Sequence, residues 1–240
     1  MKKNLIQSFV DGVKDEHNGE RYSTILLHAC PEFLTNLLLY SLPMVMDLFF
    51  VSYLRTTSAY AVVGQTNTFL HWIIKASEAF AVSTAIIAGK MNGSGDKHGA
   101  GKTLTSAFWT SCFIGGIIGL LLYTTAPLIF KFYGVSHEML DQGVAYLKLR
   151  TIGIILMFVY QACIGFLRGI KNTIVPMATF IVGTAAFIAF DYILIFGKFG
   201  CTPMGINGSA LASIIQYGIA TILVIVYLLW GPYTRAYSLR

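Results

Sequence analysis

Charged residues are scarce in this sequence, and their scarcity is the first absence that narrows the class of protein. Asp, Glu, Lys and Arg make up 12% of the 240 residues, whereas 55% are hydrophobic. A soluble domain carries about twice that charged fraction. The stretch from 103 to 130 contains no charge at all and is long enough to cross a bilayer. With a mean hydropathy of +0.67, the composition excludes an ordinary soluble domain and predicts a polytopic membrane protein.

Motifs of the common enzyme classes are also missing. The sequence contains no H-E-x-x-H, no G-x-S-x-G and no P-loop. Its four cysteines, at 30, 112, 163 and 201, show neither pairing nor metal-ligand spacing. We therefore expect no enzymatic activity, no cofactor and no resident metal. The net charge of +6 comes from residues scattered over loops, which gives no reason to expect nucleic-acid binding.

Six apolar segments are long enough to span a membrane as helices, since a span needs about 20 residues. The residues before them form a short polar tail without the apolar core of a signal peptide. The fold class predicted from this pattern is an all-α membrane protein with six transmembrane helices. The segments are 25–53, 59–89, 104–130, 142–167, 174–197 and 206–230.

Lysine and arginine are unevenly distributed between the two ends of these segments. If the N-terminus is cytoplasmic, eleven lie on the cytoplasmic side and three on the outer side, while Lys148 and Arg150 belong to the outer turns of the fourth segment. Cytoplasmic loops of membrane proteins are enriched in Lys and Arg, so both termini are predicted to be cytoplasmic in a multi-pass protein of the cell (inner) membrane. The cytoplasmic set is Lys2, Lys3, Lys14, Arg21, Lys90, Lys97, Lys102, Arg168, Lys171, Arg235 and Arg240, and the outer set is Arg55, Lys131 and Lys198.

Two aspartates, Asp47 and Asp191, stand inside apolar segments. A carboxylate in a lipid-spanning helix is costly, so its presence points to a function. Asp47 lies eight residues before Arg55, and Asp191 lies seven before Lys198. At a rise of about 1.5 Å per residue, both carboxylates lie roughly 10–12 Å from the outer ends of their helices. The spacing predicts equal depth without saying whether the two helices are neighbours.

Pro43 precedes Asp47 by one helical turn. A proline there removes a backbone donor and clashes with the carbonyl one turn back, which predicts a kink and a hinge in the first helix. An acid in so apolar a setting favours a neutral state, reached by binding a proton or another cation. We therefore predict that Asp47 and Asp191 form a coupling site for H⁺ or Na⁺.

Further polar side chains lie in the apolar segments. Lys75 and Glu78 are three residues apart and can meet on one helix face, as a structural pair or as part of a transport path. Neutral polar groups in membrane helices either line a wet cavity or tie helices together. The candidates for lining a cavity are Tyr40, Gln65, Asn67, Thr68, Lys75, Glu78 and Gln161.

Six stretches carry a resemblance to a known family. In chain order they are VMDLFFVSYL (45–54), KMNGSGDKHGAG (90–101), PLIFKFYGVSHEMLDQGVAYLKLR (127–150), FLRGIKNTIVPM (166–177), FDYILIFGKFG (190–200) and MGINGSALAS (204–213). They are similar to motifs of the multidrug and toxic compound extrusion (MATE) transporters and follow the same order. The sequence departs from the family at Phe187, where MATE transporters commonly have Asn four residues before the second acid.

The resemblance implies a secondary antiporter that exports cationic or amphipathic compounds in exchange for H⁺ or Na⁺. It identifies Asp47 and Asp191 with the family's cation-coupling acids. MATE transporters contain twelve helices in two lobes, and this chain resembles the first lobe. The resemblance thus implies a tail at 1–24, a six-helix lobe at 25–230 and the start of an inter-lobe linker at 231–240. A second six-helix lobe, from a missing portion of the chain or a second copy, is the implied partner, besides membrane lipid and a small substrate.

Two other functions remain open from the sequence. One is a lipid-linked saccharide flippase of the same superfamily, which would need a more cationic cavity. The other is a non-transporting or regulatory half that pairs with another subunit.

Overall fold

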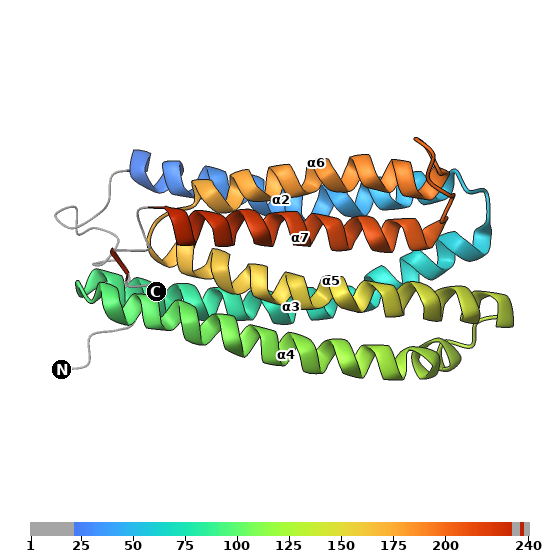
Figure 1. Ribbon diagram of the computed structural model, residues 1–240, viewed down its shortest axis with the longest axis horizontal. Helices are drawn as coiled ribbons and strands as arrows, with labels where there is room; N and C mark the ends of the chain where they lie inside the picture. The colour runs from blue at the N-terminus through green and yellow to red at the C-terminus, as the bar shows by residue number, and fades with distance from the viewer. Residues whose placement is uncertain (1–21, 232–235, 238–240) are drawn as a thin grey trace, which may run out of the picture.

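The computed structural model describes residues 22–231 and 236–237, and this part of the chain is built from long helices (Figure 1). Each of the six predicted segments is a helix, and those at 59–89, 104–130 and 142–167 are longer than predicted. Among the described residues, five helices are long and apolar enough to cross a membrane, and α2 contributes a further apolar helical stretch at Leu42–Ser52. The bounds are α2 Tyr22–Ser52, α3 Thr57–Gly93, α4 Lys97–Phe132, α5 His137–Gly169, α6 Ile174–Phe196 and α7 Ile206–Trp230.

The helices form an elongated bundle around α5. This helix packs against α3, α4 and α7, while α2 lies against α6 and α6 against α7. Helix α2 begins and α7 ends at the same end of the bundle (Figure 1). Helices α2 and α6, which carry Asp47 and Asp191, are therefore neighbours. The spacing of the two acids in the sequence did not predict this contact.

Glycines allow the helices to approach closely, as is common between membrane helices. A Cβ added at Gly115 would lie 3.1 Å from Phe158 Cβ, and one at Gly119 would lie 3.2 Å from Ile155. Both glycines belong to α4 and both contacts are on α5. The G-x-x-x-G pattern formed by Gly115 and Gly119 therefore marks a tight α4–α5 contact.

The connection between α3 and α4 contains a defined helix cap. Gly95 adopts a positive φ of 82°, which favours glycine, and the side chain of Asp96 accepts a hydrogen bond of 2.8 Å from the backbone N–H of Gly99. Asp96 thereby satisfies one of the unpaired backbone donors at the start of α4.

Replacing Asp96 with alanine is expected to destabilise the lobe by about 1 kcal/mol, because the N-cap acceptor is lost. Thermal unfolding of the detergent-solubilised protein would measure the change. Asp96→Asn retains an acceptor at the same place and should melt close to the wild type. Equal melting of the alanine and asparagine variants would contradict a role for this cap.

Candidate functional site

The carboxylate of Asp47 is buried among three helices. It is 2% exposed. The Ser209 hydroxyl on α7 donates to its Oδ1 at 2.5 Å, and the Asn67 amide on α3 donates to its Oδ2 at 3.4 Å. Both oxygens of this acid are therefore held by neutral donors rather than by a direct ion pair.

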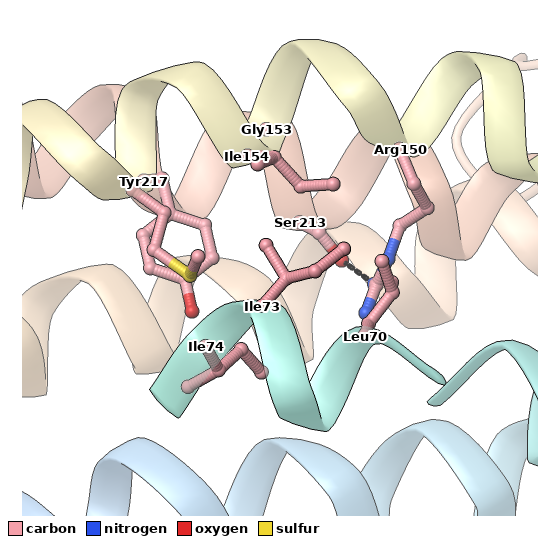
Figure 2. Close-up of a pocket in the computed structure, with 9 residues that line it drawn as sticks. Leu70, Ile73, Ile74, Arg150, Gly153, Ile154, Ser213 and Tyr217 are labelled. Carbon is pink, nitrogen blue, oxygen red and sulfur yellow. Dashed lines mark hydrogen bonds between the residues drawn. The ribbon is translucent and has the colours of Figure 1, made fainter. Parts of the chain in front are cut away.

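Arg150 joins the same group of side chains from α5. Its guanidinium donates to the Ser213 hydroxyl and, at 3.3 Å, to the Asn67 side-chain oxygen. The Ser213 hydroxyl in turn donates to the backbone oxygen of Ser209 at 3.0 Å. Asp47, Asn67, Arg150, Ser213 and Ser209 thus form a closed polar ring that links α2, α3, α5 and α7. Figure 2 shows Arg150 reaching from α5 towards α3, with its bond to Ser213.

Asp191 differs from Asp47 in that no donor among the described residues meets either of its carboxyl oxygens in hydrogen-bond geometry. It is fully buried, at 0% exposure, and neither of its carboxyl oxygens has a hydrogen-bond partner in the described part of the chain. It lies within electrostatic reach of Asp47 and Arg150, and the nearby Ser209 hydroxyl donates to Asp47 instead. An ionised carboxylate buried without a partner is costly. The burial of Asp191 therefore favours a state in which a proton or another cation neutralises its carboxylate.

A cavity of about 370 Å³ lies beside the ring. Its volume is in the range of small-molecule sites. A smaller cavity of about 30 Å³ adjoins it and shares Leu70, Ile74, Arg150, Ser213 and Tyr217 (Figure 2). The larger cavity is lined by Pro43, Met44, Val45, Asp47, Asn67, Leu70, His71, Ile74, Arg150, Phe187, Ser213, Gln216 and Tyr217.

The sequence-predicted residues occupy different places relative to this cavity. Pro43, Asp47 and Asn67 line it. Helix α2 continues through Pro43 from Tyr22 to Ser52, so the predicted hinge stays a prediction. The side chain of Tyr40 lies outside the described residues.

Three other predicted residues do not line the cavity. Thr68 is exposed and donates to the Gly64 oxygen of its own helix at 3.0 Å. Gln65 and Gln161 each have a buried side-chain oxygen without a partner among residues 22–231. Gln161, at 2% exposure, is buried within the bundle on α5. Gln65 and Gln161 thus place an oxygen in the helix packing, whereas Thr68 lies on the exposed surface, and none of the three lines the cavity.

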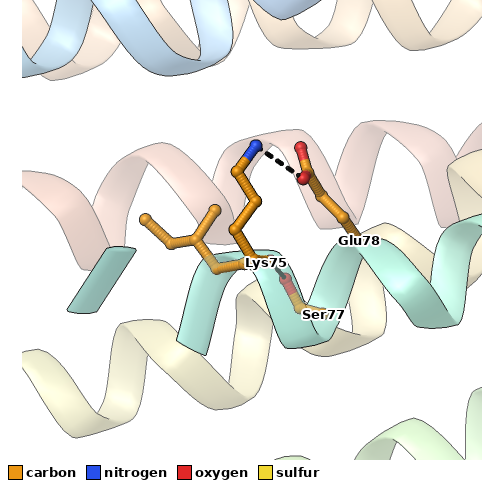
Figure 3. A network of polar contacts seen from close by, with 4 residues as sticks. Lys75, Ser77 and Glu78 are labelled. Carbon is orange, nitrogen blue, oxygen red and sulfur yellow. Dashed lines mark hydrogen bonds and ion pairs between the residues drawn. The ribbon is translucent and has the colours of Figure 1, made fainter. Parts of the chain in front are cut away.

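Lys75 and Glu78 form the predicted pair on α3. Their charged groups are 2.9 Å apart, with 48% and 25% of the side chains exposed, and both rise from the same side of the helix (Figure 3). Neither lines the 370 Å³ cavity, although Glu78 lies within electrostatic reach of its residue Tyr217. By contrast, α4 exposes large apolar side chains such as Trp109 and Phe113. Helix α3 also exposes large apolar side chains, such as Trp72 and Ile86, so the charged pair lies on a surface of mixed polarity.

Sequence reasoning missed Arg150, Ser209 and Ser213 as site residues. Arg150 was counted among the charges near a helix end, although it stands in an apolar segment, as the two aspartates do. The rule applied to the acids, that a charge inside a span points to function, would have selected it. The serines carried no such signal, because hydroxyls are common in membrane helices.

Metal-binding side chains do not gather in the described residues. No group of three or more His, Cys, Asp or Glu that could hold a metal ion occurs among them.

The fold matches solved structures of MATE proteins. The chain aligns with a MATE in complex with MaD3S at a TM-score of 0.81 and 20% identity, covering 90% of this chain and 48% of that one. It also aligns with the outward-facing conformation of a multidrug resistance MATE family transporter of the MOP superfamily at a TM-score of 0.79 and 21% identity, covering 89% and 46%. The fold is therefore that of one lobe, about half, of a MATE transporter.

Sequence comparison gives the family. The MatE family profile matches residues 31–193, and the chain belongs to this family of membrane transporters. It is 26% identical over 185 residues to "Multidrug resistance protein MdtK" of Edwardsiella ictaluri (strain 93-146), covering 77% of this chain and 39% of that protein. The chain thus spans less than half the length of this relative.

Proposed function

We propose that this chain is the six-helix lobe of a secondary antiporter that exports cationic or amphipathic compounds in exchange for H⁺ or Na⁺. The observation that carries the proposal is a pair of interacting buried acids in different states, of which Asp47 lines the cavity. Asp47 is held by Ser209 and Asn67, whereas Asp191 accepts no hydrogen bond within the described part of the chain. Such a pair can bind and release a cation. Two nearby carboxylates disfavour each other's ionised form, so a proton on one acid makes it easier for the other to carry its charge.

Competition for negative charge supplies the coupling. The ionised carboxylate of Asp47 at the cavity wall attracts a substrate cation. A proton or Na⁺ that neutralises the acids removes this attraction and favours release. Neutralising Asp47 also weakens the ring that joins α2 to α3 and α7, which frees α2 to bend near Pro43. Bending there would shrink the cavity and expel the substrate outward.

A second six-helix lobe completes this proposal. The aligned MATE transporters are about twice as long as this chain, and rocking of two lobes about a central site gives alternating access. The exposed pair Lys75 and Glu78 supports a covered or wet α3 face, since charges facing lipid at mid-helix are costly. The partner lobe is either further chain or a second copy. The Lys and Arg bias supports cytoplasmic ends for residues 1–24 and 231–240.

The position of Arg150 on the cavity wall favours the flippase alternative, because a guanidinium can bind a pyrophosphate group through paired hydrogen bonds. Two buried acids close to it oppose that function, since they would repel the same anion. The antiporter accounts for the two buried acids, which the flippase leaves unexplained.

Transport by the native gene product tests the proposal and separates the two coupling ions. Purified protein in proteoliposomes is expected to drive dye counter-flow under a proton gradient or a Na⁺ gradient. Because Asp191 is the acid that calls for a cation, Asp191→Asn should uncouple transport from the gradient that drives it. Asp141→Asn makes the same change at an exposed position of α5 and should transport normally. Counter-flow that ignores both gradients would refute the antiporter.

A further inference from the structure

Arg150 places a fixed positive charge on the wall of a cavity proposed to accept cations. It lines both the larger and the smaller cavity, together with Ser213 and Tyr217. A guanidinium at this place repels a simple cation. A ligand that fits this cavity must therefore be compatible with the positive group of Arg150 as well as with the negative group of Asp47.

The positive and negative groups of the cavity are held apart. No ion pair within 4.0 Å joins Asp47 to Arg150 among the described residues. The Asn67 amide stands between them, donating to Asp47 at 3.4 Å and accepting from Arg150 at 3.3 Å. The wall thus presents two separate charges of opposite sign rather than one neutralised pair.

The guanidinium of Arg150 also has N–H donors that make no hydrogen bond within the described residues. It carries five N–H donors in a planar fork, and its hydrogen bonds within the described residues are those to Ser213 and Asn67. Both partners are neutral. A carboxylate entering the cavity would give the remaining donors the charged acceptor for which their geometry is suited.

We propose that Arg150 binds a carboxylate of the exported compound, so that this lobe favours zwitterionic substrates with a cation near Asp47 and a carboxylate at Arg150. The inference rests on the proposed export function and names its substrate class. With Asp47 ionised, the two wall charges sum to zero, and a zwitterion matches both at once. A monocation matches the acid and is repelled by the guanidinium.

A matched pair of dyes tests this preference. Rhodamine 110 carries a cationic ring system and a free carboxylate at neutral pH, and its methyl ester, rhodamine 123, keeps only the cation. Binding to the native gene product in nanodiscs can be followed by fluorescence anisotropy. The wild-type protein is expected to bind the free acid about tenfold more tightly, since a charge-assisted hydrogen bond supports a difference of that size.

Variants assign the preference to one side chain. Arg150→Gln removes the charge and should reverse the order, because the acid loses its partner and the ester loses a repelling neighbour. Arg150→Lys keeps the charge without the fork and should give a smaller preference for the acid. Lys148→Gln removes a cation two residues away that stacks on Tyr123 outside the cavity, and it should leave the ratio unchanged.

The outcomes separate the zwitterion preference from the export function. Equal or tighter binding of the ester by the wild-type protein overturns the zwitterion inference and leaves the export function standing. An acid preference that survives in a folded Arg150→Gln protein overturns the role of Arg150. Failure of the wild-type protein to bind either dye counts against both the inference and the export of such cations.

Discussion

Replacing Asp47 with asparagine is expected to reduce export by the native gene product at least about tenfold, since the charged partner of the substrate cation is lost. Asparagine matches the size of the acid and keeps an oxygen to accept from Ser209. The lobe should therefore still fold and reach the membrane. The measurement is resistance of an efflux-deficient host to cationic dyes, with protein level determined on the same cells.

The matched control for this change is Asp141→Asn. Asp141 lies exposed near the start of α5 and does not line the cavity. Its replacement removes the same charge with the same geometry, and resistance should stay at the wild-type level. Resistance that persists in the Asp47→Asn host at equal protein level would exclude this acid from transport.

Replacing Gly165 with alanine is expected to give the largest loss of stability in the bundle. A Cβ at this position on α5 would meet the carbonyl oxygen of Ala81 on α3 and would lie 2.8 Å from Ala81 Cα. Both are backbone atoms, so the clash can be relieved only by separating two helices of the central contact. Overpacking of this kind costs about 1–3 kcal/mol and sometimes more.

Gly116→Ala in α4 provides the control, because a Cβ there meets nothing within 4 Å. Alanine also favours a helix over glycine by up to about 1 kcal/mol, so this variant should melt at or above the wild-type temperature. Fluorescence-detected size-exclusion after heating measures both variants. Wild-type melting of Gly165→Ala would mean that α3 and α5 do not approach as closely as the structure has them.

The helices themselves could be predicted because their signal is local. An apolar run of sufficient length defines a membrane helix wherever its neighbours lie, and Gly95 and Asp96 mark the boundary between α3 and α4 by turn and cap chemistry. The extra turns of α3, α4 and α5 were not predicted, since they consist mostly of polar residues and glycines beyond the apolar core. Hydropathy does not register those turns.

The cavity could be predicted only in part. Asn67 was selected as a polar residue in an apolar helix, and it lines the cavity. Gln65, Thr68 and Gln161 were selected by the same rule and face elsewhere. Residues one or two positions apart on a helix point in different directions, so the choice among them depends on which face the neighbouring helices cover.

The sequence by itself determined the class of protein, the helices and the two acids within them, because composition, length and position along one helix are properties of the chain alone. The tertiary structure decided that α2 lies against α6 and that Arg150, Ser209 and Ser213 gather around Asp47. These contacts join residues far apart in the chain, such as Asp47 and Ser209, which are separated by 162 positions. Packing of whole helices sets them, and no local pattern encodes that packing.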